Sequence, residues 1–152
     1  MTSPGKKDTS QGNLIRPKRL SYVIPGDPNN ILKPAFLKAQ KGIFDDIKNQ
    51  KLVTAITLRT QHGELDYFQG PLHVEFQFFM PLSNHKARKD WTDNYHTAHK
   101  ALDDLIDYVL CCCNHILWST KDIVSSLTAH KRYSRQPRTE FTVCQLERKY
   151  VK

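Results

Sequence analysis

The chain has 152 residues, enough for one compact domain and too few for two comfortable ones. Lys and Arg number 23 against 15 Asp and Glu, and the formal net charge of +8 favours a polyanionic partner such as nucleic acid. The absence of a run of about 18 apolar residues argues against a membrane partner, and four cysteines without zinc-type spacing indicate reduced thiols in a cytoplasmic, non-secreted protein.

The N-terminal part combines a polar tail with the first two elements of a domain. Residues 1–18 contain Gly, Pro, Ser and Lys with little to bury, so we expect a flexible basic tail ahead of a domain over residues 19–148. The apolar run Leu20–Ile24 predicts a strand that ends in the Pro- and Gly-containing turn Pro25–Pro28. From Ala35 to Gln50, apolar residues recur at helical spacing and predict a helix.

The middle of the chain mixes weak and strong patterns. The β-prone run Leu52–Leu58 predicts a short strand, and residues 61–70 a polar loop. Apolar and polar residues alternate over His73–Met80, which is the period of a strand with one buried face. Residues 82–95 are polar, basic and aromatic and predict an exposed loop, whereas Leu102–Cys113 carries the apolar stripe of a helix.

Two further strands close the domain. Evenly spaced apolar residues predict one over Asp122–Arg132, although its serines also allow a helix, and alternation predicts the last over Thr139–Leu146. The main elements then follow one another as β-α-β-α-β-β, so we expect an α/β domain of the α+β kind, in which a small mixed sheet is combined with two main helices.

Several segments, in this order and at these intervals, resemble the RusA-type Holliday junction resolvases (crossover junction endodeoxyribonucleases). They are YVIPGDP from Tyr22, GPLHVEFQFFMP from Gly70, YHTAHKALDDLIDYVL from Tyr95, ILWSTKDIV from Ile116 and KRYSRQPRTEFTV from Lys131. The resemblance implies a RusA-like domain. It also implies a homodimer that binds branched DNA in recombination and repair and cuts it with Mg²⁺.

The acidic motif of that family is altered in this chain. Family members carry Lys-Pro-Asp-x-Asp-Asn-Leu-x-Lys, where the carboxylates hold Mg²⁺ and the final Lys supports the phosphate. Here Ala101 replaces the first Asp, Asp103 keeps the second, Asp104 replaces Asn and Asp107 replaces Lys. A following Asp-Asp pair of the family aligns with Ser119-Thr120.

Two interpretations of these acids stay open. Asp103, Asp107 and Asp122 are candidate catalytic residues of a rearranged site to which Asp104 also belongs, and Asp103 is the candidate metal ligand. Asp103 and Asp107 are four residues apart and therefore share one helix face. The other interpretation is a solvated acidic face opposite the apolar stripe, which we prefer. Mg²⁺ is expected only if the centre is active, and no other cofactor or small-molecule substrate is expected.

Two basic clusters flank the helix predicted at Leu102–Cys113. Cations and flat rings suit phosphate contacts and base stacking, although an ordinary solvated surface would look similar. The candidate DNA-binding residues are Lys86, Arg88, Lys89, Trp91, His96, Lys100, Lys131, Arg132, Arg135 and Arg138. His96 and His99 lack partners for zinc at the usual spacing. His96 matches a histidine often found before the family motif, so the resemblance implies a positioning role. Cys111–Cys113 is expected in the core or in a dimer contact.

The leading hypothesis is a RusA-like homodimer that binds branched or duplex DNA without efficient cleavage. The first alternative is an active Mg²⁺-dependent junction endonuclease that uses Asp103 with neighbouring acids. The second is a RusA-like fold reused to bind a protein partner.

Overall fold

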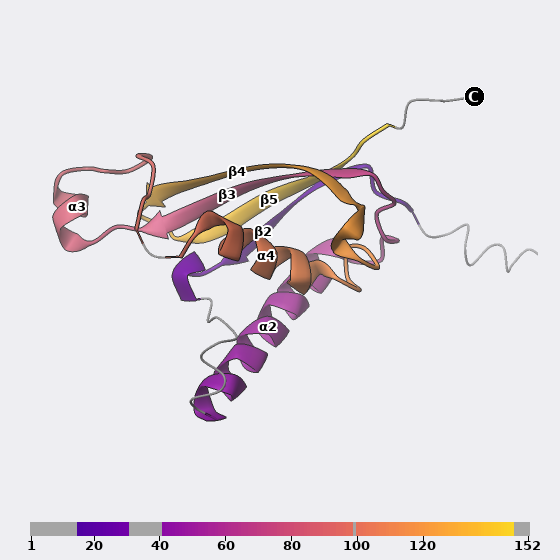
Figure 1. The fold of residues 1–152 in the computed structure, drawn as a ribbon, viewed down its shortest axis with the longest axis horizontal. Helices are drawn as coiled ribbons and strands as arrows, with labels where there is room; N and C mark the ends of the chain where they lie inside the picture. Colours follow the sequence, from indigo (N-terminus) through magenta and orange to yellow (C-terminus); the bar gives the residue numbers. More distant parts are fainter. Residues whose placement is uncertain (1–14, 31–40, 99, 148–152) are drawn as a thin grey trace, which may run out of the picture.

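The computed structural model describes residues 15–30, 41–98 and 100–147, and its centre is a four-stranded mixed sheet (Figure 1). In spatial order the strands are β2 (Arg19–Pro25), β5 (Arg138–Gln145), β3 (Leu72–Pro81) and β4 (Val124–Ser134). β5 runs antiparallel to both of its neighbours, whereas β3 and β4 are parallel. The predicted mixed sheet and the order of the main elements are confirmed.

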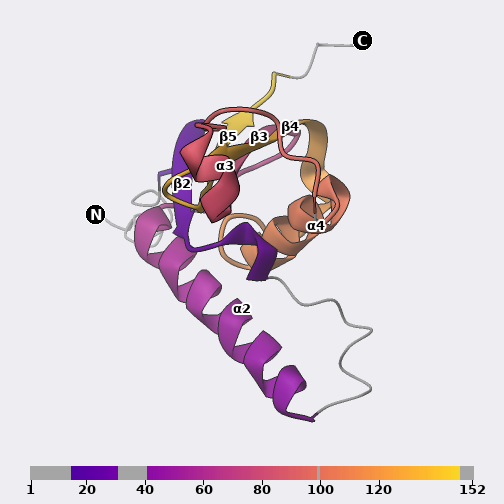
Figure 2. The same cartoon turned by 90° about the vertical axis from the view of Figure 1, so that its left-hand side faces the viewer.

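Two helices cover one side of this sheet. α2 (Lys41–His62) and α4 (Leu102–Cys113) both lie below it in Figure 1, and Figure 2 shows the same arrangement end-on. No helix of the described residues covers the opposite face of the sheet, and the first turns of α2 extend beyond the sheet. The domain therefore has two layers, with its core between the sheet and the helices.

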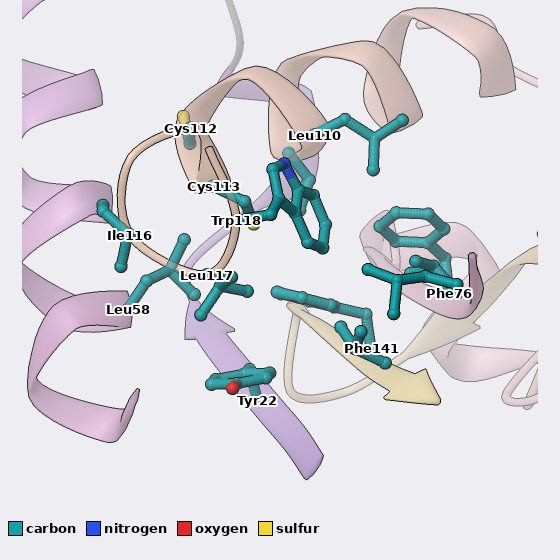
Figure 3. Close-up of a cluster of buried hydrophobic side chains, with 14 of the residues drawn as sticks. Tyr22, Leu58, Phe76, Leu110, Cys112, Cys113, Ile116, Leu117, Trp118 and Phe141 are labelled. Atoms are coloured by element: carbon teal, nitrogen blue, oxygen red, sulfur yellow. The ribbon is translucent and has the colours of Figure 1, made fainter. Parts of the chain in front are cut away.

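The core forms because alternate strand residues point toward the helices. In β3, Val74, Phe76, Phe78 and Met80 are buried, as the alternation predicts, and Phe76 lies against Phe141 of β5 with ring centroids 5.6 Å apart. Trp118, fully buried in the segment after α4, fills the space between these layers (Figure 3). Its indole Nε1 donates to Asn114 Oδ1 at 3.0 Å, so the polar atom of the ring is satisfied.

The strand predicted over Leu52–Leu58 is wrong, because this run belongs to α2. Thr54, Leu58 and His62 are four residues apart and buried, so helical spacing places them on one face toward the core. The β-branched residues of the run suggested a strand, but packing of this face overrides so weak a preference. Gly63, at φ +65°, ends the helix and donates its N–H to Arg59 O at 2.9 Å.

The other predicted elements differ less from the observed ones. The loop predicted at 82–95 contains the short helix α3 (Asn84–Arg88), and a 3₁₀ turn, η3 (Lys121–Ile123), precedes β4. A second 3₁₀ turn, η1, spans Pro28–Asn30. The predicted helix residues 35–40 and the tail residues 1–14 lie outside the described residues.

The cysteines pack as expected for small apolar side chains. Cys112 and Cys113 are buried at the end of α4, Cys111 and Cys144 are partly exposed, and all four are free thiols. Burial raises the pKa of Cys112 to about 11 and that of Cys113 well above its usual value. Among the described helices, none combines the length and apolar character needed to cross a membrane.

Candidate nucleic-acid interface

Lys86 contacts two aromatic rings at the end of the sheet where β3 and β4 finish. Its Nζ donates to Tyr133 Oη at 2.5 Å and lies 4.7 Å from the centroid of that ring. The Trp91 ring centroid is 5.0 Å from the same Nζ, and Trp91 meets Tyr133 edge-on at 5.8 Å. The aromatic rings hold the ammonium in place, so its position is built into the fold.

His96 packs against Tyr133 and is buried, with 7% of its surface exposed. Its ring meets Tyr133 at 4.9 Å, and its backbone N–H donates to Lys131 O at 3.0 Å. Lys86, His96 and Tyr133 line an open hollow of about 350 Å³, together with Asn29, Leu82 and Ser83. A buried ring of this kind positions its neighbours and presents little surface of its own to a ligand.

Lys131 connects this hollow to the start of α4. Its Nζ donates to Lys100 O at 2.9 Å, and this hydrogen bond links β4 to Lys100, two residues before the start of α4. Desolvation lowers the pKa of Lys131 from its usual value. Lys131 and Tyr133 share a sheet face with the buried residues Phe78 and Met80, their register partners in β3.

The other candidate cations that the structure describes do not line this hollow. Arg132 and Arg138 are both register partners of Phe79 and lie on the open face of the sheet, since strand neighbours alternate sides. Arg135 is exposed in the turn, 3.8 Å from Asp90. Lys89 is exposed after α3, and the side chain of Arg88 lies outside what the structure describes. The structure therefore divides the second basic cluster between two faces.

The acids at the start of α4 lie in its first turn. Asp103 is exposed and Asp104 is partly exposed, and Ala101 at the N-cap makes no side-chain hydrogen bond. Asp103 Oδ1 accepts from the Asp104 N–H at 3.0 Å. Carboxylates in a first turn stabilise a helix through its dipole, so their presence has a local structural explanation.

Asp107 is paired with a lysine. Lys121 Nζ donates to Asp107 Oδ1 at 2.6 Å, and this hydrogen bond raises the pKa of Lys121. Asp122 is exposed, and its N–H donates to Thr120 Oγ1. Within the described ranges, no three His, Cys, Asp or Glu residues come together in a group able to hold a metal ion. The described residues therefore do not fit a Mg²⁺ centre.

Two aromatic residues near these cations were outside the candidate set. Tyr95 belongs to the loop whose cations and flat rings suit phosphate contacts and base stacking, and it is 62% exposed beside Arg132. Phe79 was missed, although one signal was present. It occupies an outward position of an alternating strand, where a polar residue is the rule.

Comparison with known families adds one match. The model of the family described as "Endodeoxyribonuclease RusA" matches residues 25–144, well over half of the chain. The matched range includes β3, β4 and α4 and almost all of β5. No curated protein matches the chain.

Proposed function

Because this chain belongs to the RusA family of endodeoxyribonucleases, we propose that it binds branched DNA through the basic and aromatic end of its sheet. The family acts on DNA, and junction binding in recombination is the role that membership suggests. The observation that carries the proposal is the Lys86 ammonium, held against Trp91 and Tyr133 beside the hollow.

The arrangement suits phosphate groups. A lysine whose position is set by rings loses little side-chain entropy when it meets a phosphate, and each neutralised phosphate releases counterions. Trp91, at 37% exposed, adds a flat surface next to the cation. Lys131 and Lys100 extend the basic surface to the start of α4.

We propose further that cleavage is inefficient. Family resolvases usually use Mg²⁺, which needs several carboxylates on one site. In this chain Asp107 is paired with Lys121, and Ala101 and Thr120 supply no carboxylate. An ammonium 2.6 Å from Asp107 occupies the acid that a metal would otherwise share, which supports binding without efficient cutting.

A homodimer also belongs to this proposal. α2 exposes three large apolar side chains, Leu52, Val53 and Ile56, each with more than half of its surface exposed. Apolar residues grouped on one helix commonly mark protein contacts. Light scattering of the purified protein measures its mass, and a monomer at all concentrations would contradict this part.

The main experiment titrates the protein with a labelled four-way junction and with linear duplex of the same sequence over a series of salt concentrations. Lys86→Met keeps most of the aliphatic stem and removes the charge. We expect weaker binding and a salt slope reduced by about one. Lys51→Met on exposed α2 is the matched control, since it changes the net charge equally away from the hollow.

The outcomes separate the candidate functions. Equal and negligible binding of junction and duplex at moderate salt would contradict the DNA proposal, and salt-insensitive association with a protein alone would favour the protein-binding alternative. Mg²⁺-dependent nicking of the junction that Asp103→Ala abolishes would establish the endonuclease and contradict inefficient cleavage.

A further inference from the structure

The open face of the sheet carries a row of alternating rings and cations. Tyr95 pairs with Arg132 through an isolated antiparallel bridge, Arg132 is the register partner of Phe79, and Phe79 is the register partner of Arg138. The four residues therefore lie side by side across a loop and three strands. We call this set the cation–aromatic row.

The Tyr95 end of the row is available to a ligand. Its ring is 62% exposed, and the guanidinium carbon of Arg132 lies 5.0 Å from the ring centroid. Arg132 Nη2 donates to Tyr95 Oη at 3.3 Å, whereas its Nε is buried and has no hydrogen-bond partner. Arg132 forms no ion pair with any described carboxylate, so its charge is not neutralised locally.

The other end of the row is closed. The guanidinium carbon of Arg138 stacks 3.8 Å from the centroid of the Phe79 ring, and its Nε donates to Glu140 Oε2 at 2.6 Å. The ion pair with Glu140 neutralises the charge of Arg138, and the stacked guanidinium covers the Phe79 ring. The free cation and the accessible ring therefore coincide at Tyr95 and Arg132.

We propose that the Tyr95 and Arg132 end of the row binds unpaired nucleotides, with a base stacked on Tyr95 and a phosphate on Arg132. The proposal rests on the proposed function, because it assigns the contact for a strand that leaves the duplex at a branch. Tyr133, which holds Lys86, is the next residue after Arg132 in β4, so the two surfaces meet at the edge of the sheet.

The chemistry favours an unpaired nucleotide over other anions. Every base has a flat face that stacks on an aromatic ring, and only unpaired or splayed bases expose that face. A planar guanidinium with free N–H groups contacts the phosphate of the same nucleotide. Duplex DNA offers phosphates without base faces, and an acidic peptide offers charge without a ring to stack.

The test compares binding of short oligothymidine and of linear duplex by the full chain, by Tyr95→Leu and by Tyr95→Phe. We expect Tyr95→Leu to weaken oligothymidine binding about tenfold and duplex binding by less than about twofold. Tyr95→Phe retains the ring and is expected to retain binding. Photocrosslinking with oligothymidine that carries iododeoxyuridine should attach the base to Tyr95, as located by mass spectrometry.

Several results would overturn this proposal. Equal oligothymidine affinity in the parent protein and Tyr95→Leu, or crosslinks only at Trp91, would place the base elsewhere. Poly-glutamate that competes as well as oligothymidine would make the row a site for acidic peptides. Junction binding without oligothymidine binding would contradict the proposed role of the cation–aromatic row and leave the proposed function intact. Absence of both kinds of binding would contradict both proposals.

Discussion

The two faces of the sheet differ in what holds their residues in place. The helix-facing side consists of apolar residues, such as Phe76, Phe141 and Val143, packed against α2, α4 and the segment around Trp118 (Figure 3). The open side consists of polar residues and the cation–aromatic row. Burial orders the first set, whereas hydrogen bonds and cation–π contacts order the second. Stability and ligand binding are thus assigned to opposite sides of the same strands.

The largest expected effect is loss of stability from the covered face. Phe141→Ala removes a fully buried ring that contacts Tyr22 and Phe76 and leaves a cavity, so we expect the free energy of unfolding to fall by about 3–5 kcal/mol. Urea denaturation followed by circular dichroism measures the change. Its neighbour Thr142, on the open face with a hydroxyl 2.7 Å from that of Ser21, is the matched control. Similar losses in the free energy of unfolding for Phe141→Ala and Thr142→Ala would contradict the assignment of stability to the helix-facing side.

The second prediction concerns thiol reactivity. The thiolate is the reactive form, and burial raises the pKa of Cys112 from 9.0 to about 11, so at about pH 8 its thiolate fraction falls about a hundredfold. We expect an aromatic disulfide reagent to modify Cys144, on the open face, and Cys111 well before Cys112 and Cys113. Mass spectrometry of peptides over time identifies the order. In denaturant all four should react, and early native modification of Cys113 would contradict its burial.

The third effect tests a close approach beside the sheet. A methyl group on Gly70 would lie 2.6 Å from Ile123 Cβ, so the chain before β3 or the η3 turn must shift. We expect Gly70→Ala to lower the free energy of unfolding by about 1–3 kcal/mol. The adjacent exposed Gln69 provides the control Gln69→Ala. A thermal melt that separates the two variants supports the packing, and no difference between them would show that the turn yields freely.

The smallest expected effect is that of Asp107→Asn. The Asp107 and Lys121 side chains are 64% and 37% exposed, and exposed ion pairs contribute less than about 1 kcal/mol. We therefore expect nearly unchanged stability and junction affinity. Calorimetry and the salt titration provide the two measurements. A large loss of Mg²⁺-dependent nicking in this variant would instead identify Asp107 as a working ligand.

The elements that the sequence predicted correctly are those whose local pattern agrees with their burial. β3 and β5 alternate with a period of two residues, α4 has a period of 3.6 residues, and β2 contains a short apolar run that ends at turn residues. The strand predicted over Leu52–Leu58 is wrong because the β-branched residues of this run favour a strand locally, whereas the run belongs to α2. The contact of Thr54 and Tyr108, whose oxygens lie 3.1 Å apart, belongs to a helix packed on another helix.

For the candidate interface, too, some features could be predicted from the sequence and others depend on tertiary structure. The amino-acid sequence alone was enough to identify the RusA family and the basic character of residues 86–100 and 131–138. Tertiary structure decided which of these residues act together. Arg132 and Tyr133 are adjacent in sequence, yet strand alternation sends them to opposite faces, toward Tyr95 and Lys86 respectively. Those partners are about 40 residues away in the chain, and only strand register and packing bring them into contact.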